Sequence, residues 1–143
     1  MAKGKEKTGR LSVFKGRETK LNKAIFHILA RKSPQTIYDI HKEVKTQRGL
    51  RQTRYANVNK RVRALEKSGY VKKVGVKKTK TGFQASTYEL TSRAHLVMIL
   101  SQTNLDHFVE EAEDEDVLSA LAALTSAARL LSADRNHAVS ESN

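Results

Sequence analysis

The sequence predicts a mainly α-helical protein with one small β-hairpin. Through most of the chain, apolar residues recur three and four positions apart, which is the period of helices that bury one face. Between residues 71 and 90 the period changes to two around a glycine-containing turn, which is typical of a β-hairpin. The chain has 143 residues, of which 38% are hydrophobic. That length suffices for one compact domain with an appendage.

The charge of the chain is divided into two parts. Residues 1–90 hold 24 Lys and Arg against 6 Asp and Glu, whereas residues 91–143 hold 3 against 9. The first part therefore carries +18 and the second −6, in a chain whose formal net charge is +12. A basic surface attracts polyanions such as nucleic acids or anionic membranes. We expect only the first part to contact phosphate groups.

Several classes of function are disfavoured by the composition. The chain has no cysteine for a disulfide or a thiolate metal site, and no two of its five histidines have the spacing of a helical metal pair. No glycine-rich phosphate loop is present, so we expect neither an enzyme nor a cofactor. The sequence shows no signal peptide and no apolar run of about 18 residues, so we expect no membrane contact and a cytoplasmic, nucleoid-associated location.

The elements of the basic part follow from local signals. Residues 1–18 are polar and basic and predict a flexible arm, which either contacts phosphate or serves only as a solubilising tail. Thr19 is expected to cap a first helix that ends before Pro34. Thr36 is expected to cap a second helix, with Asp39 as a weak partner in a capping box. A turn at Gly49 leads to the third helix.

The third predicted helix, 51–68, separates apolar from basic residues. Its inner side is formed by Tyr55, Val58, Val62 and Leu65, which recur at helical spacing. Gly69 is expected to end the helix. The hairpin of residues 71–90 follows, with a turn at Thr79–Gly82 and a bulge at Val74–Gly75–Val76, where strict alternation fails. Its first strand is rich in lysine.

Helical periodicity returns at Ser92, either as one long helix or with a bend near Thr103–Asn104. A heptad spacing over Val117–Leu131 favours a homodimer over a helix that only closes the core of one chain. We therefore expect residues 92–133 to form a dimerisation region and 134–143 a polar tail. The residues expected at the dimer interface are Leu96, Leu100, Val117, Leu121, Leu124, Ala128 and Leu131.

The stretches TIYDIHKEVK, RQTRYANVNKRVRALEKSGYVKKVG and STYELTSRA, in this order, resemble a winged helix-turn-helix domain. The resemblance covers roughly residues 19–90, and we expect the DNA-binding domain to span residues 19–91. The junction STYELTSRA is similar to that of MarR-like and PadR-like prokaryotic (archaeal-type) transcription regulators. In those families, C-terminal helices dimerise. The resemblance implies a homodimeric transcription regulator that binds double-stranded DNA.

A side chain reads a base edge from the exposed face of a helix in the major groove. We expect helix 51–68 to enter the major groove and the hairpin wing to lie on the flanking backbone. The residues expected to contact DNA are Arg51, Gln52, Thr53, Arg54, Ala56, Asn57, Lys60, Arg61 and Arg63 on the helix, and Lys73, Lys77, Lys78 and Lys80 on the wing.

Other functions stay open at this level. The same basic surfaces suit a module that binds RNA or a protein partner, or a sequence-neutral chromatin protein. No residue set marks a pocket for a small-molecule effector, and the sequence gives neither an operator nor a direction of regulation.

Overall fold

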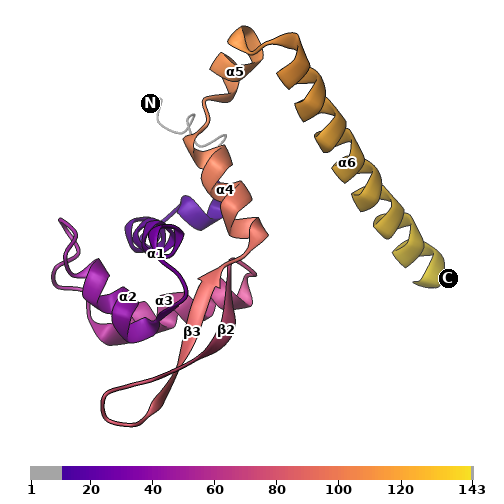
Figure 1. Cartoon of the computed structure of the whole chain (residues 1–143). Coiled ribbons are helices and arrows are strands. Elements are labelled where there is room, and N and C mark those ends of the chain that lie inside the picture. Colours follow the sequence, from indigo (N-terminus) through magenta and orange to yellow (C-terminus); the bar gives the residue numbers. More distant parts are fainter. Residues whose placement is uncertain (1–10, 143) are drawn as a thin grey trace. The chain divides into compact units, whose positions relative to one another are not determined.

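A computed structural model of the chain describes residues 11–142, and the side chains of residues 11–129 (Figure 1). The chain divides into two units, residues 1–102 and 103–143. The first contains a 3₁₀ turn, η2, followed by helices α1–α4 and strands β1–β3, and the second contains α5 and α6. The bounds are η2 Ser12–Phe14, α1 Thr19–Arg31, β1 Gln35–Thr36, α2 Ile37–Val44, α3 Tyr55–Lys67, β2 Val71–Lys78, β3 Gln84–Leu90, α4 Ser92–Gln102, α5 Leu105–Glu111 and α6 Asp114–Ser142.

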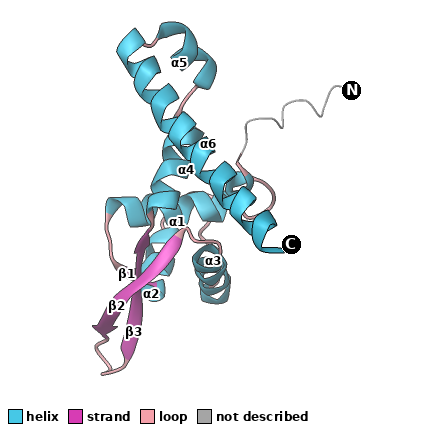
Figure 2. Cartoon of the chain, turned by 90° about the vertical axis from the view of Figure 1, so that its right-hand side faces the viewer, coloured by secondary structure: helices cyan, strands magenta, loops and turns pink. Residues whose placement is uncertain are grey.

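The strands of the first unit form a three-stranded antiparallel sheet in the order β1-β3-β2. Figure 2 shows β2 and β3 as a hairpin that extends beyond the neighbouring helices. The predicted bulge is confirmed, because Lys73 pairs with Tyr88 and Gly75 with Thr87, which leaves Val74 unpaired. Strand β1 was not predicted from the sequence, since two residues are too few to show a period.

The core of the first unit lies between α1, α2, α3 and the sheet. The aliphatic residues of α1 and α2 pack with Val58, Val62 and Leu65 of α3, and Tyr88 of β3 is 1% exposed. Tyr55 departs from the expected inner side of α3 and is 46% exposed. Its ring instead packs edge-on against His41, with ring centroids 5.8 Å apart.

Two of the predicted helix boundaries are confirmed in atomic detail. The Thr36 side chain caps α2 by accepting a hydrogen bond from the Asp39 backbone amide at 3.0 Å. Gly69, with a φ of 86°, follows α3, where its amide donates to the Glu66 carbonyl and the Tyr70 amide to that of Leu65. This is the Schellman pattern that satisfies the last carbonyl groups of a helix. Thr19, however, is the first residue of α1 rather than its cap, and its hydroxyl donates to the Gly16 carbonyl.

The packed part of the chain begins earlier than the expected boundary at Glu18. Val13 and Phe14 are buried, and the Phe14 ring lies edge-on to Phe26 with centroids 5.4 Å apart. The η2 turn has only three residues, which is too short to leave a helical period in the sequence. The first ten residues of the predicted arm lie outside the described residues.

The first unit also ends later than the expected boundary at Thr91. Ala94 and Val97 of α4 are buried in its core, so α4 continues the domain. The predicted bend is present as a break: α4 ends at Gln102, and Asn104 caps α5 by accepting from the His107 amide at 3.0 Å. In the second unit, α6 extends to Ser142, so the backbone of the predicted polar tail continues a helix.

Candidate nucleic-acid interface

The outward side of α3 is basic and uncovered in the described structure. Because a helix turns by about 100° per residue, Val58, Val62 and Leu65 face the core together. The opposite side carries exposed residues of small or basic type, namely Ala56, Lys60, Arg63 and Lys67. The one acidic residue of the helix, Glu66, lies at the edge of this side and is half-buried. The separation of apolar and basic residues predicted for this helix is therefore confirmed.

Asn59, a polar residue on this face, was not singled out from the sequence. The Arg63 Nε atom donates a hydrogen bond to Asn59 Oδ1 at 3.1 Å, one helical turn away. This contact holds the exposed guanidinium against the surface of α3 through its Nε atom. The spacing of four residues was the signal that could have found the pair. Asn57, an expected base contact, is exposed at the other edge of the same face.

The start of α3 is fixed by the preceding helix. The His41 Nε2 atom of α2 donates to the Thr53 carbonyl oxygen at 2.9 Å. Thr53 is half-buried, while Arg51, Gln52 and Arg54 beside it are exposed. Arg54 is the N-cap residue and makes no capping hydrogen bond through its side chain. The positive end of the helix dipole and two arginines thus meet solvent at the same place.

Arg61, which the sequence placed among the DNA contacts, is turned toward α1. Its Nε atom donates to Asn22 Oδ1 of α1 at 3.1 Å and lies 3.8 Å from Glu18 Oε2. The side chain is only 21% exposed. Arg61 therefore links α3 to α1, and its charge is already paired within the domain. The helical projection placed it at the flank of the basic face, next to the core, and gave no information about its partner on α1.

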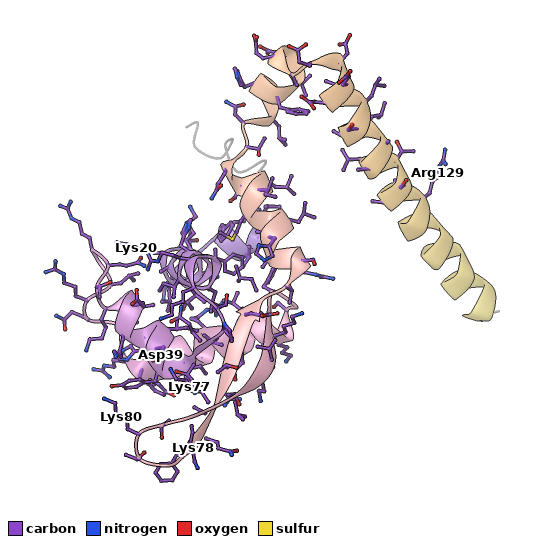
Figure 3. All side chains as sticks on the ribbon, in the orientation of Figure 1. Lys20, Asp39, Lys77, Lys78, Lys80 and Arg129 are labelled. Atoms are coloured by element: carbon purple, nitrogen blue, oxygen red, sulfur yellow. The ribbon has the colours of Figure 1, made fainter. Side chains whose placement is uncertain are left out.

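The wing carries five exposed lysines, at positions 72, 73, 77, 78 and 80. Two of them are paired: Lys77 Nζ lies 3.3 Å from Asp39 Oδ2 of α2, and Lys72 Nζ lies 3.5 Å from Glu89 Oε1. Figure 3 shows Lys77 beside Asp39 and Lys78 and Lys80 farther along the hairpin. The ion pair of Lys77 therefore connects the wing to α2. The other three, Lys73, Lys78 and Lys80, are exposed cations that form no ion pair with the residues described here.

The electrostatics of Asp39 are consistent with this connection. Burial by itself would raise the pKa of the Asp39 carboxyl, but hydrogen bonds from Thr36 and Lys77 and the positive charge of Lys77 outweigh it. The pKa of Asp39 is therefore lowered from its ordinary value. The carboxylate is charged at neutral pH, which keeps the contact with the wing in place.

A further cation lies beside the turn between α2 and α3. A Cβ atom added to Gly49 would collide with the end of the Lys20 side chain, which crosses this turn from α1. Gly49 has a φ of 83°, which favours glycine here independently of space. Lys20, labelled in Figure 3, thus adds positive charge to the same turn as the exposed Arg48. Neither residue was expected in the interface from the sequence.

The residues predicted for dimerisation are exposed within their own units. On α4, Leu96 is 57% and Leu100 39% exposed. On α6, Val117, Leu121 and Leu124 are 37%, 58% and 70% exposed, and Ala128 is exposed as well. The Leu131 side chain lies outside the described side chains. Both units therefore present apolar surface that the described residues of the same unit do not cover.

Two negative findings apply to the part of the chain that the structure describes. Its His, Asp and Glu side chains form no group of three or more that could hold a metal ion. Among the same residues, no helix combines the length and the apolar character that crossing a membrane requires.

The order helix, strand, helix, helix and hairpin, with β1 at the free edge of β3, identifies the architecture of the first unit. It is a winged helix-turn-helix. The predicted fold class is thereby confirmed, with α2 and α3 as the helix-turn-helix pair and β2–β3 as the wing.

The chain was compared with known families, sequences and solved structures. No protein-family model and no curated protein sequence matches the chain. The chain is similar to diamide-treated YodB from B. subtilis, with 18% identity over 71% of this chain and 88% of that chain, at a TM-score of 0.49. It is also similar to Bacillus subtilis PadR in complex with operator DNA, with 21% identity over 82% of this chain and 65% of that chain, at a TM-score of 0.48. Streptococcus pneumoniae FabT in complex with DNA is 15% identical over 86% of this chain and 84% of that chain, at a TM-score of 0.40.

Proposed function

We propose that this protein is a transcription regulator that binds duplex DNA, with α3 in the major groove and the wing on the flanking backbone. The observation that carries the proposal is the division of α3 into a buried aliphatic side and an exposed basic side. Any surface helix buries one apolar side, but its exposed side usually mixes acids and bases, which serves solubility well. An excess of cations on one uncovered side is the electrostatic footprint expected of a surface that meets phosphate.

The individual residues of α3 suit different parts of a DNA contact. Ala56 is small and permits close approach of the helix to the groove. Asn57 has the paired donor and acceptor that adenine requires, while Lys60 and Arg63 can donate to guanine. Arg51, Gln52 and Arg54 at the start of the helix are exposed and suited to phosphates, which fix register rather than sequence.

The wing supplies the second part of the proposed contact. Lys73, Lys78 and Lys80 are exposed along the hairpin and are assigned here to the phosphate backbone beside the major-groove site. Lys77 contributes its charge to the same surface, but its closest acidic partner is Asp39. Its assigned role is therefore to hold the wing against α2.

The apolar surfaces of α4 and α6 support a homodimer as the acting form. Leu96, Leu100, Val117, Leu121, Leu124, Ala128 and Leu131 are the residues assigned to that interface. A two-fold dimer would place two copies of α3 one turn of DNA apart, about 34 Å. The net negative charge of residues 91–143 would disfavour contact of this region with DNA.

The test is a titration of the protein against duplex DNA, duplex RNA of the same sequence, and single strands at several salt concentrations. We expect tightest binding to duplex DNA, because the deep, narrow major groove of duplex RNA does not admit a helix. Six to ten phosphate contacts would lower the affinity roughly 10³–10⁵-fold between about 50 and 200 mM salt. Preference for RNA, or an affinity independent of salt, would contradict the proposal. Selection from random DNA separates a regulator from a sequence-neutral chromatin protein, because only the regulator enriches a defined motif.

A further inference from the structure

The tip of the wing carries an aromatic side chain that is largely open to solvent. Phe83 is 73% exposed, more than any other exposed large hydrophobic side chain of the described residues. It lies directly after the turn Thr79–Gly82. A single exposed apolar residue is ordinary on a protein surface. Its position among lysines, at the end of an element proposed to touch DNA, gives this one a specific role.

The backbone around Phe83 is held in place by hydrogen bonds. The Thr79 amide donates to the Phe83 carbonyl at 2.7 Å, and the Phe83 amide donates to Thr79 Oγ1 at 3.1 Å. The Gly82 amide also donates to the Thr79 carbonyl at 3.0 Å, and Gly82 adopts the positive φ of 90° that this tight turn requires. Phe83 is therefore presented by a closed turn, so little backbone entropy remains to be lost when its ring is buried.

The hairpin also determines which way this position faces. Ala85 pairs with Lys77 in the β2–β3 ladder, and alternate residues of a strand share a face. Phe83 thus follows the face of Ala85 and Lys77, the one from which Lys77 reaches Asp39 on α2. Lys78 precedes the same turn and Lys80 lies within it, and residues 71–88 contain no acidic residue. The part of the hairpin next to the ring therefore carries cations and no acid.

We propose that Phe83 is an apolar wedge that enters the minor groove of duplex DNA and partly unstacks one base step. This inference rests on the proposed binding of duplex DNA and adds a deformation of that DNA to it. Lys78 and Lys80 hold the phosphates on either side while the ring takes the place of the lost stacking partner. Apolar wedges of this kind kink the duplex toward the major groove. Such a wedge favours pyrimidine–purine steps such as TA and CA/TG, because these unstack most easily.

The experiment compares wild-type protein with Phe83→Ala and Phe83→Leu on two duplexes of about 30 base pairs, one with TA and CA steps and one with uninterrupted A-tracts. Affinity is measured by titration, and bending by energy transfer between dyes on the two DNA ends. Val76→Ala is the matched control, since Val76 is 63% exposed on the same hairpin but lies away from the turn. Lys80→Ala serves as the control for loss of a phosphate contact.

We expect Phe83→Ala to lose roughly tenfold in affinity for the flexible duplex and most of the bend. Its salt dependence stays unchanged, whereas Lys80→Ala lowers the salt slope by about 1. Phe83→Leu keeps the bend, because leucine is also an effective wedge, and Val76→Ala behaves as wild type. A Phe83→Ala protein that binds and bends both duplexes as wild type does would overturn the wedge and leave the proposed function intact. Failure of the wild-type protein to bind duplex DNA would overturn both.

Discussion

The Nε atom of Arg61 on α3 donates a hydrogen bond to the Oδ1 atom of Asn22 on α1, at 3.1 Å. Asn22 is buried, and its Nδ2 atom donates in turn to the Val13 carbonyl oxygen at 2.9 Å. A single amide side chain therefore joins the N-terminal turn, α1 and α3. Because α3 is the helix proposed to enter DNA, this contact on its side toward α1 helps to fix the orientation of the proposed DNA-binding helix in the domain.

Replacement of Asn22 with alanine is expected to destabilise the domain. The change leaves the Val13 carbonyl and the Arg61 guanidinium without their partner, and an unsatisfied buried polar group costs about 1–3 kcal/mol. The free energy of unfolding from urea denaturation is the measurement. Asn59→Ala is the matched control, because its partner Arg63 is exposed and can bind water. Equal stability of the two variants would contradict the assigned role of Asn22.

Alanine substitution of the neighbouring residues Lys60 and Arg61 is expected to affect two different quantities, DNA affinity for Lys60 and stability for Arg61. Lys60→Ala should weaken DNA binding and lower the salt slope by about 1, with a change in stability within about 0.5 kcal/mol. Arg61→Ala should lower the free energy of unfolding by about 1–3 kcal/mol, because it leaves the Oδ1 atom of the buried Asn22 without its donor. Parallel denaturation and DNA titration separate the two effects. An Arg61→Ala protein of unchanged stability with strongly reduced affinity for DNA would show that Arg61 contacts DNA.

The ion pair between Lys77 and Asp39 predicts an acid-dependent stability. The pKa of Asp39 is lowered in the folded protein. Its contribution to stability is therefore complete above the unfolded-state pKa of about 3.9, and it is lost as the pH falls through the lower folded-state value. Asp39→Asn should remove this part of the acid dependence, and Lys77→Ala should reduce it, when thermal unfolding is followed from neutral pH downward. Identical acid profiles for all three proteins would contradict the pairing.

The proposed dimer predicts a strong effect of charge on one side of α6. Leu121→Glu with Leu124→Glu should convert a dimer to a monomer in sedimentation equilibrium, because two carboxylates would have to be buried between the chains. Affinity for a two-fold symmetric DNA site should fall with it, since each monomer then binds one half-site alone. Ser126→Glu is the control, as it lies on the opposite side of the helix by projection. A wild-type protein that sediments as a monomer at all concentrations would exclude this interface.

The sequence predicted the features that local periodicity and capping determine. The buried side of α3, the Thr36 cap, the bulge at Val74 and the Gly69 terminus all depend on residues within one or two turns of each other, so their signals are contained in short stretches. The MarR-like and PadR-like resemblance was carried by these same stretches.

The features that the sequence did not predict depend on partners far along the chain. Asn22 and Arg61 are 39 residues apart, and Lys77 and Asp39 are 38 apart, so no local pattern could show that either cation was already paired. The η2 turn and β1 are too short to show a period. For α4, only the packed positions of Ala94 and Val97 show that it belongs to the winged domain.

The most direct test of the central claim is the binding of duplex DNA by the triple variant Asn57→Ala, Lys60→Ala, Arg63→Ala. All three side chains are exposed, so the variant should unfold at the same temperature as wild type. The matched control is Arg93→Ala with Arg129→Ala, which removes an equal amount of positive charge from residues 91–143. We predict that the triple variant loses about 100-fold or more in affinity, at roughly 1–3 kcal/mol for each base contact, while the control keeps nearly all of its affinity. A folded triple variant that binds duplex DNA as tightly as the control would contradict the assignment of α3 to DNA.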